Sequence, residues 1–255
     1  MSENSIFGVV EPLACVLRGK HSLVSLKLAE CQLTPKASLA LLSALEESSA
    51  VHTNLLCHLS LALNTLHRES TKVGENPHWG PNVGMTLWKT STLTSLDLSS
   101  TGLRFPCKEL ERGIIHNAVL HTLSLSANRI GDEGGKVIAK ILKKNRGIMV
   151  FDISANLFTH NTASLLVKGL RERHRRSLKS TRMKPTGDTS SFFYSAPPTR
   201  GTTGVMMETL NLRENKLGLD DQQKSELVAV LQQFVGVVLV DQGLDSSICD
   251  GVQEF

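Results

Sequence analysis

The chain has 255 residues, of which 40% are hydrophobic, 20% charged and 4% aromatic, an ordinary composition for a folded protein. No stretch approaches the roughly 18 consecutive apolar residues of a membrane-spanning helix, so we expect no membrane association. The five scattered cysteines contain no Cys-x-x-Cys pair, which argues against a zinc or disulfide framework. The net charge of +4 is uneven, because residues 171–204 carry eight Lys or Arg and only two acids.

The N-terminal 20 residues predict a capping helix, because Leu13, Val16 and Leu17 fall on one face of Glu11–Arg18. These residues lack the basic and apolar pattern of a signal peptide. We therefore expect a cytoplasmic protein, with the cytoskeleton or a flagellum as finer expectations.

A spacing of the form Leu-x-x-Leu-x-Leu-x-x-Asn-x-Leu recurs between residues 21 and 245. Each copy alternates apolar and polar positions, as a strand with one buried face does, and an apolar helical stretch follows. Units of this kind cannot bury their apolar side alone, so they must stack. The first positions of the copies are Leu23, Leu56, Leu93, Leu120, Ile148, Met207 and, in a degenerate seventh copy, Val235. Residues 246–255 are expected to form a C-terminal tail.

The ninth position of a copy lies where the chain leaves the strand. A buried asparagine amide there can bond backbone groups of the bend that would otherwise be unpaired. Cys31 and Thr101 replace the asparagine in two copies and are small enough to fit. The residues of this predicted asparagine ladder are Asn64, Asn128, Asn156 and Asn215.

The repeat is interrupted at residues 71–89, which hold both tryptophans, Trp79 and Trp88, among Pro and Gly. A tryptophan in such a loop indicates either a packed edge or a contact site. Both interpretations remain open.

The second insertion, residues 171–204, starts as the continuation of a helix and then turns to Ser, Thr, Pro and Gly. Three interpretations stay open: docking onto the solenoid or simple disorder, a binding motif for a protein partner, and contact with RNA or an acidic protein surface. The candidate residues of this loop motif are Arg173, Arg175, Arg176, Phe192, Phe193 and Tyr194.

Strand positions three, five and seven are expected to point to one face, which repeat arrays of this kind use for binding. The residues there are mostly small and weakly polar, and only Arg213 belongs to a type common at binding hot spots. Small residues suit closely spaced parallel strands, and a smooth floor with Asp97 and Asp152 would also admit a helix or a basic segment. The candidate binding residues are Lys27, Asp97, Asp152, Asn211 and Arg213.

No catalytic, cofactor or metal site is predicted. The sequence has no phosphate-binding loop, no His-Glu-x-x-His and no Gly-x-Ser-x-Gly, and its nine histidines are dispersed. We therefore expect a protein that is not an enzyme and takes neither a cofactor nor a small-molecule substrate.

These copies resemble the leucine-rich repeat family, and in particular its ribonuclease-inhibitor-like, helix-containing class. The copies at Leu120 and Ile148 match best, and 130–134 (Ile-Gly-Asp-Glu-Gly) is similar to the usual link from strand to helix. The resemblance covers residues 9–245 apart from the insertions. It implies an α/β solenoid, a horseshoe with inner parallel β-strands and outer α-helices.

For function, the resemblance implies a non-enzymatic protein–protein interaction scaffold. The class includes cytoskeletal and axonemal proteins, so we expect a subunit of a larger intracellular assembly. It also includes a GTPase-activating protein, which makes a regulator of a small GTPase one alternative. A ribonucleoprotein component that uses the basic 171–204 loop is the other.

Overall fold

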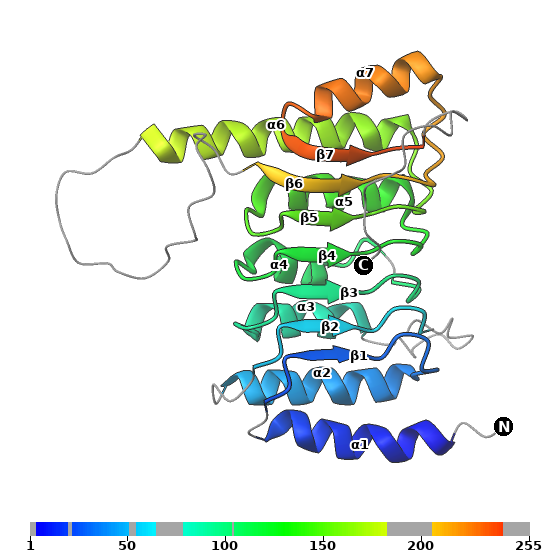
Figure 1. The fold of residues 1–255 in the computed structure, drawn as a ribbon, viewed down its shortest axis with the longest axis vertical. Coiled ribbons are helices and arrows are strands. Elements are labelled where there is room, and N and C mark those ends of the chain that lie inside the picture. Colours follow the sequence, from blue (N-terminus) through cyan, green and yellow to red (C-terminus); the bar gives the residue numbers. More distant parts are fainter. Residues whose placement is uncertain are drawn as a thin grey trace.

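The computed structural model describes residues 4–19, 22–50, 55–64, 79–103, 105–182 and 206–241. Within these ranges, seven parallel strands form one sheet in chain order, and helices between them cover one face of it (Figure 1). The predicted leucine-rich repeat solenoid of parallel strands and helices is confirmed. The strands are β1 (Ser25–Lys27), β2 (His58–Ser60), β3 (Ser95–Asp97), β4 (Thr122–Ser124), β5 (Val150–Asp152), β6 (Met207–Asn211) and β7 (Val235–Leu239). The helices are α1 (Asn4–Arg18), α2 (Pro35–Ala50), α3 (Trp79–Lys89), α4 (Lys108–His116), α5 (Gly131–Lys144), α6 (His160–Arg182) and α7 (Asp221–Leu231).

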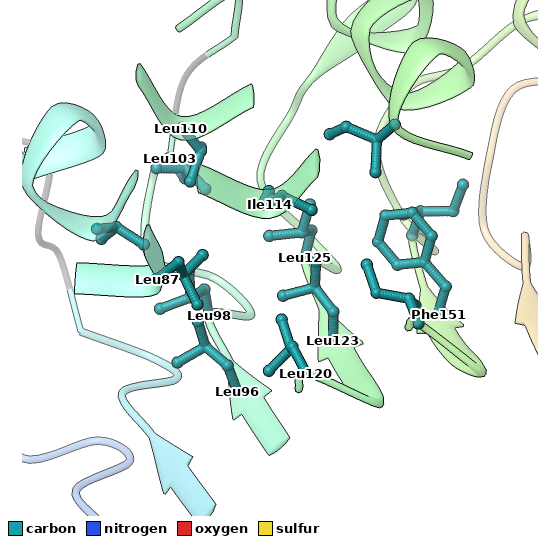
Figure 2. Packing of buried hydrophobic residues seen from close by; sticks show 14 of the residues in the cluster. Leu87, Leu96, Leu98, Leu103, Leu110, Ile114, Leu120, Leu123, Leu125 and Phe151 are labelled. Carbon is teal, nitrogen blue, oxygen red and sulfur yellow. The ribbon is translucent and has the colours of Figure 1, made fainter. Parts of the chain in front are cut away.

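The strands pair in a register that places equivalent positions of successive copies side by side. Leu96 therefore aligns with Leu123, and Leu123 with Phe151. These central side chains point towards the helices and are buried, so each copy completes the core of the next. Figure 2 shows this layer, in which Leu98 and Leu125, the residues directly after β3 and β4, pack with Leu87, Leu110 and Ile114 of the helices. Each buried Leu contributes about 1.5–3 kcal/mol.

The chain bends sharply where each strand ends. The residue at position eight adopts the left-handed conformation, with φ of 56° at Leu63 and 53° at Ala127. This backbone conformation costs a non-glycine residue about 1–2 kcal/mol. It lets the N–H group continue the sheet, because the N–H of Leu63 donates to the carbonyl of Ser99 at 2.9 Å and that of Ala127 to Ser154 at 3.0 Å.

The buried asparagines of the ninth position hold these bends. The Asn128 amide donates to the carbonyls of Leu98, Leu125 and Ser126, and its Oδ1 accepts the N–H groups of Thr101 and Leu103. One side chain therefore pairs backbone groups of its own copy and of the preceding copy, which satisfies polar groups that water cannot reach.

These asparagines form a continuous ladder in the C-terminal half. Asn215 Oδ1 accepts the N–H of Asn156 at 2.9 Å, and Asn156 Oδ1 accepts the N–H of Asn128 at 3.0 Å. In the copies without asparagine, the Thr101 hydroxyl donates to the Leu98 carbonyl at 2.8 Å, and the Cys31 thiol lies 3.3 Å from the Ala29 carbonyl. The Cys31 contact stays within its own copy, whereas the Thr101 hydroxyl also lies 3.3 Å from Asn128 Oδ1 of the next copy.

Two pairs of neighbouring helices, α3 with α4 and α5 with α6, pack especially closely. A Cβ added at Gly84 of α3 would overlap the backbone of Glu109, and one added at Gly169 of α6 would overlap the carbonyl of Ala139 in α5. These glycines allow α3 to approach α4 and α6 to approach α5 backbone to backbone.

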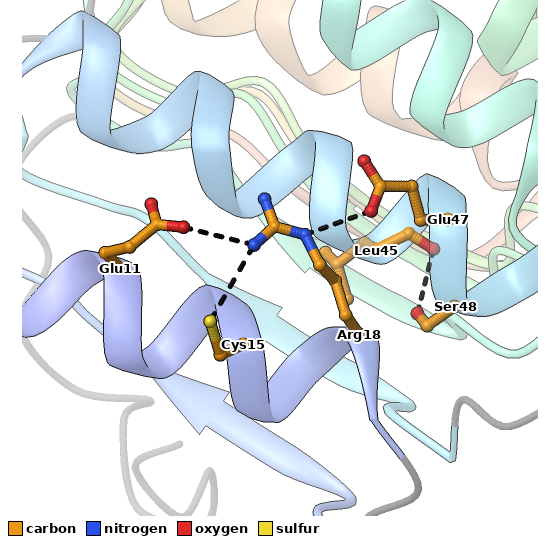
Figure 3. A network of polar contacts seen from close by, with 6 residues as sticks. All are labelled: Glu11, Cys15, Arg18, Leu45, Glu47 and Ser48. Atoms are coloured by element: carbon orange, nitrogen blue, oxygen red, sulfur yellow. Dashed lines mark hydrogen bonds and ion pairs between the residues drawn. The ribbon is translucent and has the colours of Figure 1, made fainter.

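The N-terminal end of the core is covered by α1, where Ala14 and Leu17 are fully buried. Arg18 fixes this helix to α2, because its guanidinium contacts Glu11 at 3.2 Å and Glu47 of α2 at 3.0 Å (Figure 3). These ion pairs are partly exposed and contribute little individually.

We expected residues 71–89 to be an insertion between copies, and this expectation was wrong for residues 79–89. Residues 79–89 are α3, the helix that connects β2 and β3, with Val83 and Leu87 in the core. The Pro-Gly composition concealed this helix because its close contact with α4 requires a small residue. Trp88 is half exposed, and its ring lies 5.1 Å from that of His116.

Within the part of the chain that the structure describes, none of the helices is long and apolar enough to span a membrane.

Replacing Asn128 by alanine is expected to lower the free energy of unfolding by ~3 kcal/mol, because buried N–H and carbonyl groups lose their partners. Urea denaturation followed by circular dichroism measures the change. Gln232→Ala, at the exposed end of α7, is the matched control and should shift stability by less than about 0.5 kcal/mol. Equal effects of the two variants would contradict the structural role of Asn128.

Gly84→Ala is expected to destabilise the protein by about 2 kcal/mol or more, although alanine is the better helix former, because its methyl group overlaps the backbone of α4. Gly19→Ala provides the control, since a Cβ there makes only ordinary contacts at 3.6 Å. A stabilised Gly84→Ala protein in thermal denaturation would show that the two helices do not pack this closely.

Candidate interaction surface

The concave face is the face of the sheet turned away from the helices, formed by strand positions three, five and seven. The central residue of each short strand is packed against the helices, and its two neighbours point to this face. Short side chains dominate it, so the floor is smooth. Its position-five residues are Lys27, Ser60, Asp97, Ser124, Asp152, Asn211 and Leu239.

Asp97 is the centre of a hydrogen-bond network on this floor. Its Oδ2 accepts the Ser60 hydroxyl at 2.9 Å, and its Oδ1 accepts the Ser99 hydroxyl at 2.6 Å. The Ser99 hydroxyl also lies 2.7 Å from that of Ser124. The network connects three adjacent strands and fixes the directions in which these groups present donors and acceptors.

Asp152 and Asn211 repeat one part of this arrangement. Asp152 Oδ1 accepts the backbone N–H and the hydroxyl of Ser154, at 3.0 and 2.8 Å, and Asn211 Oδ1 accepts the N–H of Arg213 at 3.1 Å. Both residues thus fix the end of their strand, a local role of the kind that short polar side chains often take. In the described residues, Asp152 Oδ2 forms no hydrogen bond.

The predicted binding residues lie on one face but not in one cluster. Asp97 and Asp152 lie two strands apart, roughly 10 Å at the usual strand spacing. Lys27 and Arg213 are exposed and lie towards opposite ends of the sheet. The floor is therefore acidic and hydroxyl-rich in the middle and has a cation on each side. Among the described residues, no group of three or more His, Cys, Asp or Glu side chains could hold a metal ion.

Arg173, which we expected to be a binding residue of the loop motif, is a buried residue of α6 with 5% of its surface exposed. Its Nη2 donates to the carbonyls of Ile148 at 2.8 Å and Arg146 at 3.3 Å. Burial, together with the charge of Arg146, lowers the pKa of Arg173 to about 10. The expectation was wrong for this residue, because it pairs backbone carbonyls inside the protein.

Arg175 and Arg176 also belong to α6, which continues into the insertion as the sequence predicted. Arg175 contacts Glu172 at 2.8 Å and Arg176 contacts it at 3.1 Å, both as neighbours on the same helix. The hydrogen bonds from Arg175, followed by those from Arg176, lower the pKa of Glu172 to about 2. The remaining loop-motif residues, Phe192, Phe193 and Tyr194, lie outside the described residues.

Sequence reasoning missed a second series of buried amides at the ends of helices. Asn117 follows α4 and donates to the Leu87 carbonyl, and its Oδ1 accepts the N–H of Leu120 at 2.7 Å. Asn145 follows α5 and donates to the carbonyls of Ile114 and Asn117. The signal was present, because each lies three residues before the first position of a copy. In the following copy, Arg173 of α6 makes the corresponding contacts, with the carbonyls of Arg146 and Ile148.

Asp132 was also missed as a structural group. Its carboxylate accepts hydrogen bonds from the Thr159 and Thr162 hydroxyls, both at 2.6 Å, and so joins the start of α5 to the start of α6. Burial alone would raise the pKa of Asp132, but the hydrogen bonds from Thr159 and Thr162 outweigh it and hold the pKa below its usual value.

A comparison with protein-family models agrees with the repeat. Residues 116–139, which run from the end of α4 through β4 into α5, match the family model described as Leucine Rich repeat. A search of curated proteins found no match. Among solved structures, the chain is similar to leiomodin-1 actin-binding site 2 (ABS2), with 18% sequence identity and a TM-score of 0.46 over 71% of this chain and 98% of that one.

Arg173→Met is expected to lower the free energy of unfolding by about 1–3 kcal/mol, because the carbonyls of Arg146 and Ile148 lose their donor. Arg171→Met, on the exposed side of the same helix, should change it by less than about 0.5 kcal/mol. Chemical denaturation of both variants measures this difference. If Arg171→Met is the more harmful substitution, the assigned role of Arg173 is wrong.

Proposed function

We propose that this chain is a non-enzymatic protein–protein interaction scaffold, of the ribonuclease-inhibitor-like class of leucine-rich repeat proteins, and that the concave face binds its partner. The observation that carries the proposal is the ordered polar network around Asp97. Its groups are already oriented, so binding would cost little side-chain entropy.

The chemistry of the floor favours a partner segment that is cationic in its middle. Asp97 and Asp152 place two negative charges near the centre, and Asp152 Oδ2 is an unoccupied acceptor among the described residues. The short serine side chains permit close approach of a helix or an extended chain, and their hydroxyls can exchange hydrogen bonds with its polar groups. Lys27 and Arg213 discriminate against partners whose flanking residues are also basic.

The finer part of the proposal is that the scaffold is a subunit of an intracellular cytoskeletal or axonemal assembly. A long, shallow floor on a rigid stack suits simultaneous contact with an extended partner, as in other repeat arrays. Co-sedimentation with actin filaments and with microtubules tests this part separately. Absence from both pellets would remove the cytoskeletal assignment and leave the scaffold proposal standing.

Ser124→Trp places a large ring in the middle of the floor and is expected to reduce partner recovery at least tenfold. Quantitative affinity capture from native extract, with the full chain as bait, measures the recovery. Ser164→Trp makes the same change on the exposed surface of α6 and should leave recovery unchanged. The opposite result, loss with Ser164→Trp alone, would move the binding surface away from the concave face.

The electrostatic part of the proposal has its own test. Asp152→Lys should weaken binding of the captured partner about tenfold or more, because it replaces an attractive charge by a repulsive one. Asp221→Lys, an equal change of charge on α7, should have little effect. Equal losses would mean that net charge, and not the floor, governs association.

A further inference from the structure

The helix layer carries a strongly basic surface that no single segment of the sequence reveals. Residues of α5 and α6 turned towards solvent form two stripes at helical spacing, and nearly all the charged residues in them are basic. We call this surface the basic convex face. It consists of Lys136, Lys140, Lys143 and Lys144 of α5 and of Lys168, Arg171 and Arg175 of α6.

Contacts between the two helices place these stripes next to each other. A Cβ at Gly135 would overlap Thr162, and one at Gly169 would overlap the carbonyl of Ala139. Further along, Arg173 reaches the carbonyl of Arg146, just after α5 ends. The helices therefore lie side by side over the full length of α5. Beyond this contact, α6 extends outward from the stack (Figure 1).

Ion pairs neutralise only part of this charge. Lys136 pairs with Glu133, Lys140 with Glu111 of α4, and Arg175 with Glu172. In the described part of the chain, the other four cations form no ion pair with an acidic side chain. These four are Lys143, Lys144, Lys168 and Arg171.

The fold does not require this accumulation of cations. Lysines in the last turn of a helix are stabilised by its dipole, which accounts for Lys143 and Lys144. It does not account for Lys168 and Arg171, because α6 continues to Arg182. The neighbouring helices are mixed in charge, with Lys108, Glu109, Glu111 and Arg112 on α4 and Asp221, Lys224 and Glu226 on α7.

We propose that the basic convex face binds an acidic protein segment rich in Glu and Asp. The face lies on the opposite side of the sheet from the concave face, so the chain can hold two partners at once. The inference goes beyond the proposed function and does not depend on it, because it uses different residues and a different charge.

The surroundings of the cations favour a protein over a nucleic acid or a membrane. Single-stranded nucleic acids are usually held by aromatic rings as well as cations. Among the described residues of α5 and α6, Leu178 is the only large apolar side chain that is exposed. One leucine cannot stack on bases, and it is too little apolar surface for insertion into lipid. A dense set of charges without apolar neighbours suits carboxylates presented along a helix or an extended chain.

The experiment measures binding of a fluorescent 20-residue polyglutamate peptide by anisotropy, with a 20-residue oligouridylate and anionic lipid vesicles as competing probes. The test variant is K144E/K168E/R171E of the full chain. The control variant is K108E/R129E/K216E, which makes an identical change of charge at exposed positions elsewhere. Thermal denaturation checks that both fold, and K144Q/K168Q/R171Q replaces the test variant if it does not.

We expect wild-type protein to bind polyglutamate more tightly than oligouridylate or vesicles, with an affinity that falls as salt is raised from 50 to 200 mM. The test variant should lose about tenfold or more in affinity and the control variant less than about threefold. Three results would overturn the inference: equal losses in the two variants, absence of polyglutamate binding, or tighter binding of RNA or vesicles. None of them bears on Ser124→Trp, so the two proposals fail separately.

Discussion

The backbone polar groups at each strand end are the constraint on which the rest of this structure depends. The first five strands have only three residues each, so the chain leaves the sheet almost at once, and the bends that follow are buried between copies. Asn128 and Asn156 pair these groups, and each one bonds backbone of the preceding copy. A copy is therefore incomplete until its successor is in place, and this makes stability a sum over neighbours along the stack.

The same requirement explains the buried asparagines directly after α4 and α5. Asn117 and Asn145 pair carbonyls of the preceding connection, so the core lies between two series of buried amides. Where the insertion before β6 interrupts the pattern, the long side chain of Arg173 reaches the carbonyls from α6. A buried cation is normally costly, and its Nη1 has no partner among the described residues. Without the Arg173 side chain, the carbonyls of Arg146 and Ile148 would lose the hydrogen bonds that it donates, which would add a further cost.

The repeat, its seven strands and the fold class could be predicted because they depend on local spacing. The spacing of the apolar residues in each copy can be read directly from the sequence. The roles of Arg173 and of α3 could not be predicted in this way. The sequence alone does not distinguish Arg173 from its exposed neighbour Arg171, because the role of Arg173 depends on its contact with the carbonyl of Ile148. Gly84 suggests a loop in the sequence, whereas in the structure it is a helix residue that allows the backbone of α4 to come close.

The residues of the two candidate surfaces differ in whether the fold itself explains them. Asp97, Asp152 and Asn211 were chosen by position in the repeat, and all three also hold the chain at the end of a strand. Their polarity therefore has a local cause, and the proposed partner would use the same groups. The cations of α5 and α6 differ in this respect. Lys143, Lys144, Lys168 and Arg171 form no ion pair within the described residues, and the last two lie away from a helix end. The dipole of α5 stabilises Lys143 and Lys144, so Lys168 and Arg171 are the two charges that the fold does not explain and on which the proposed acidic partner depends.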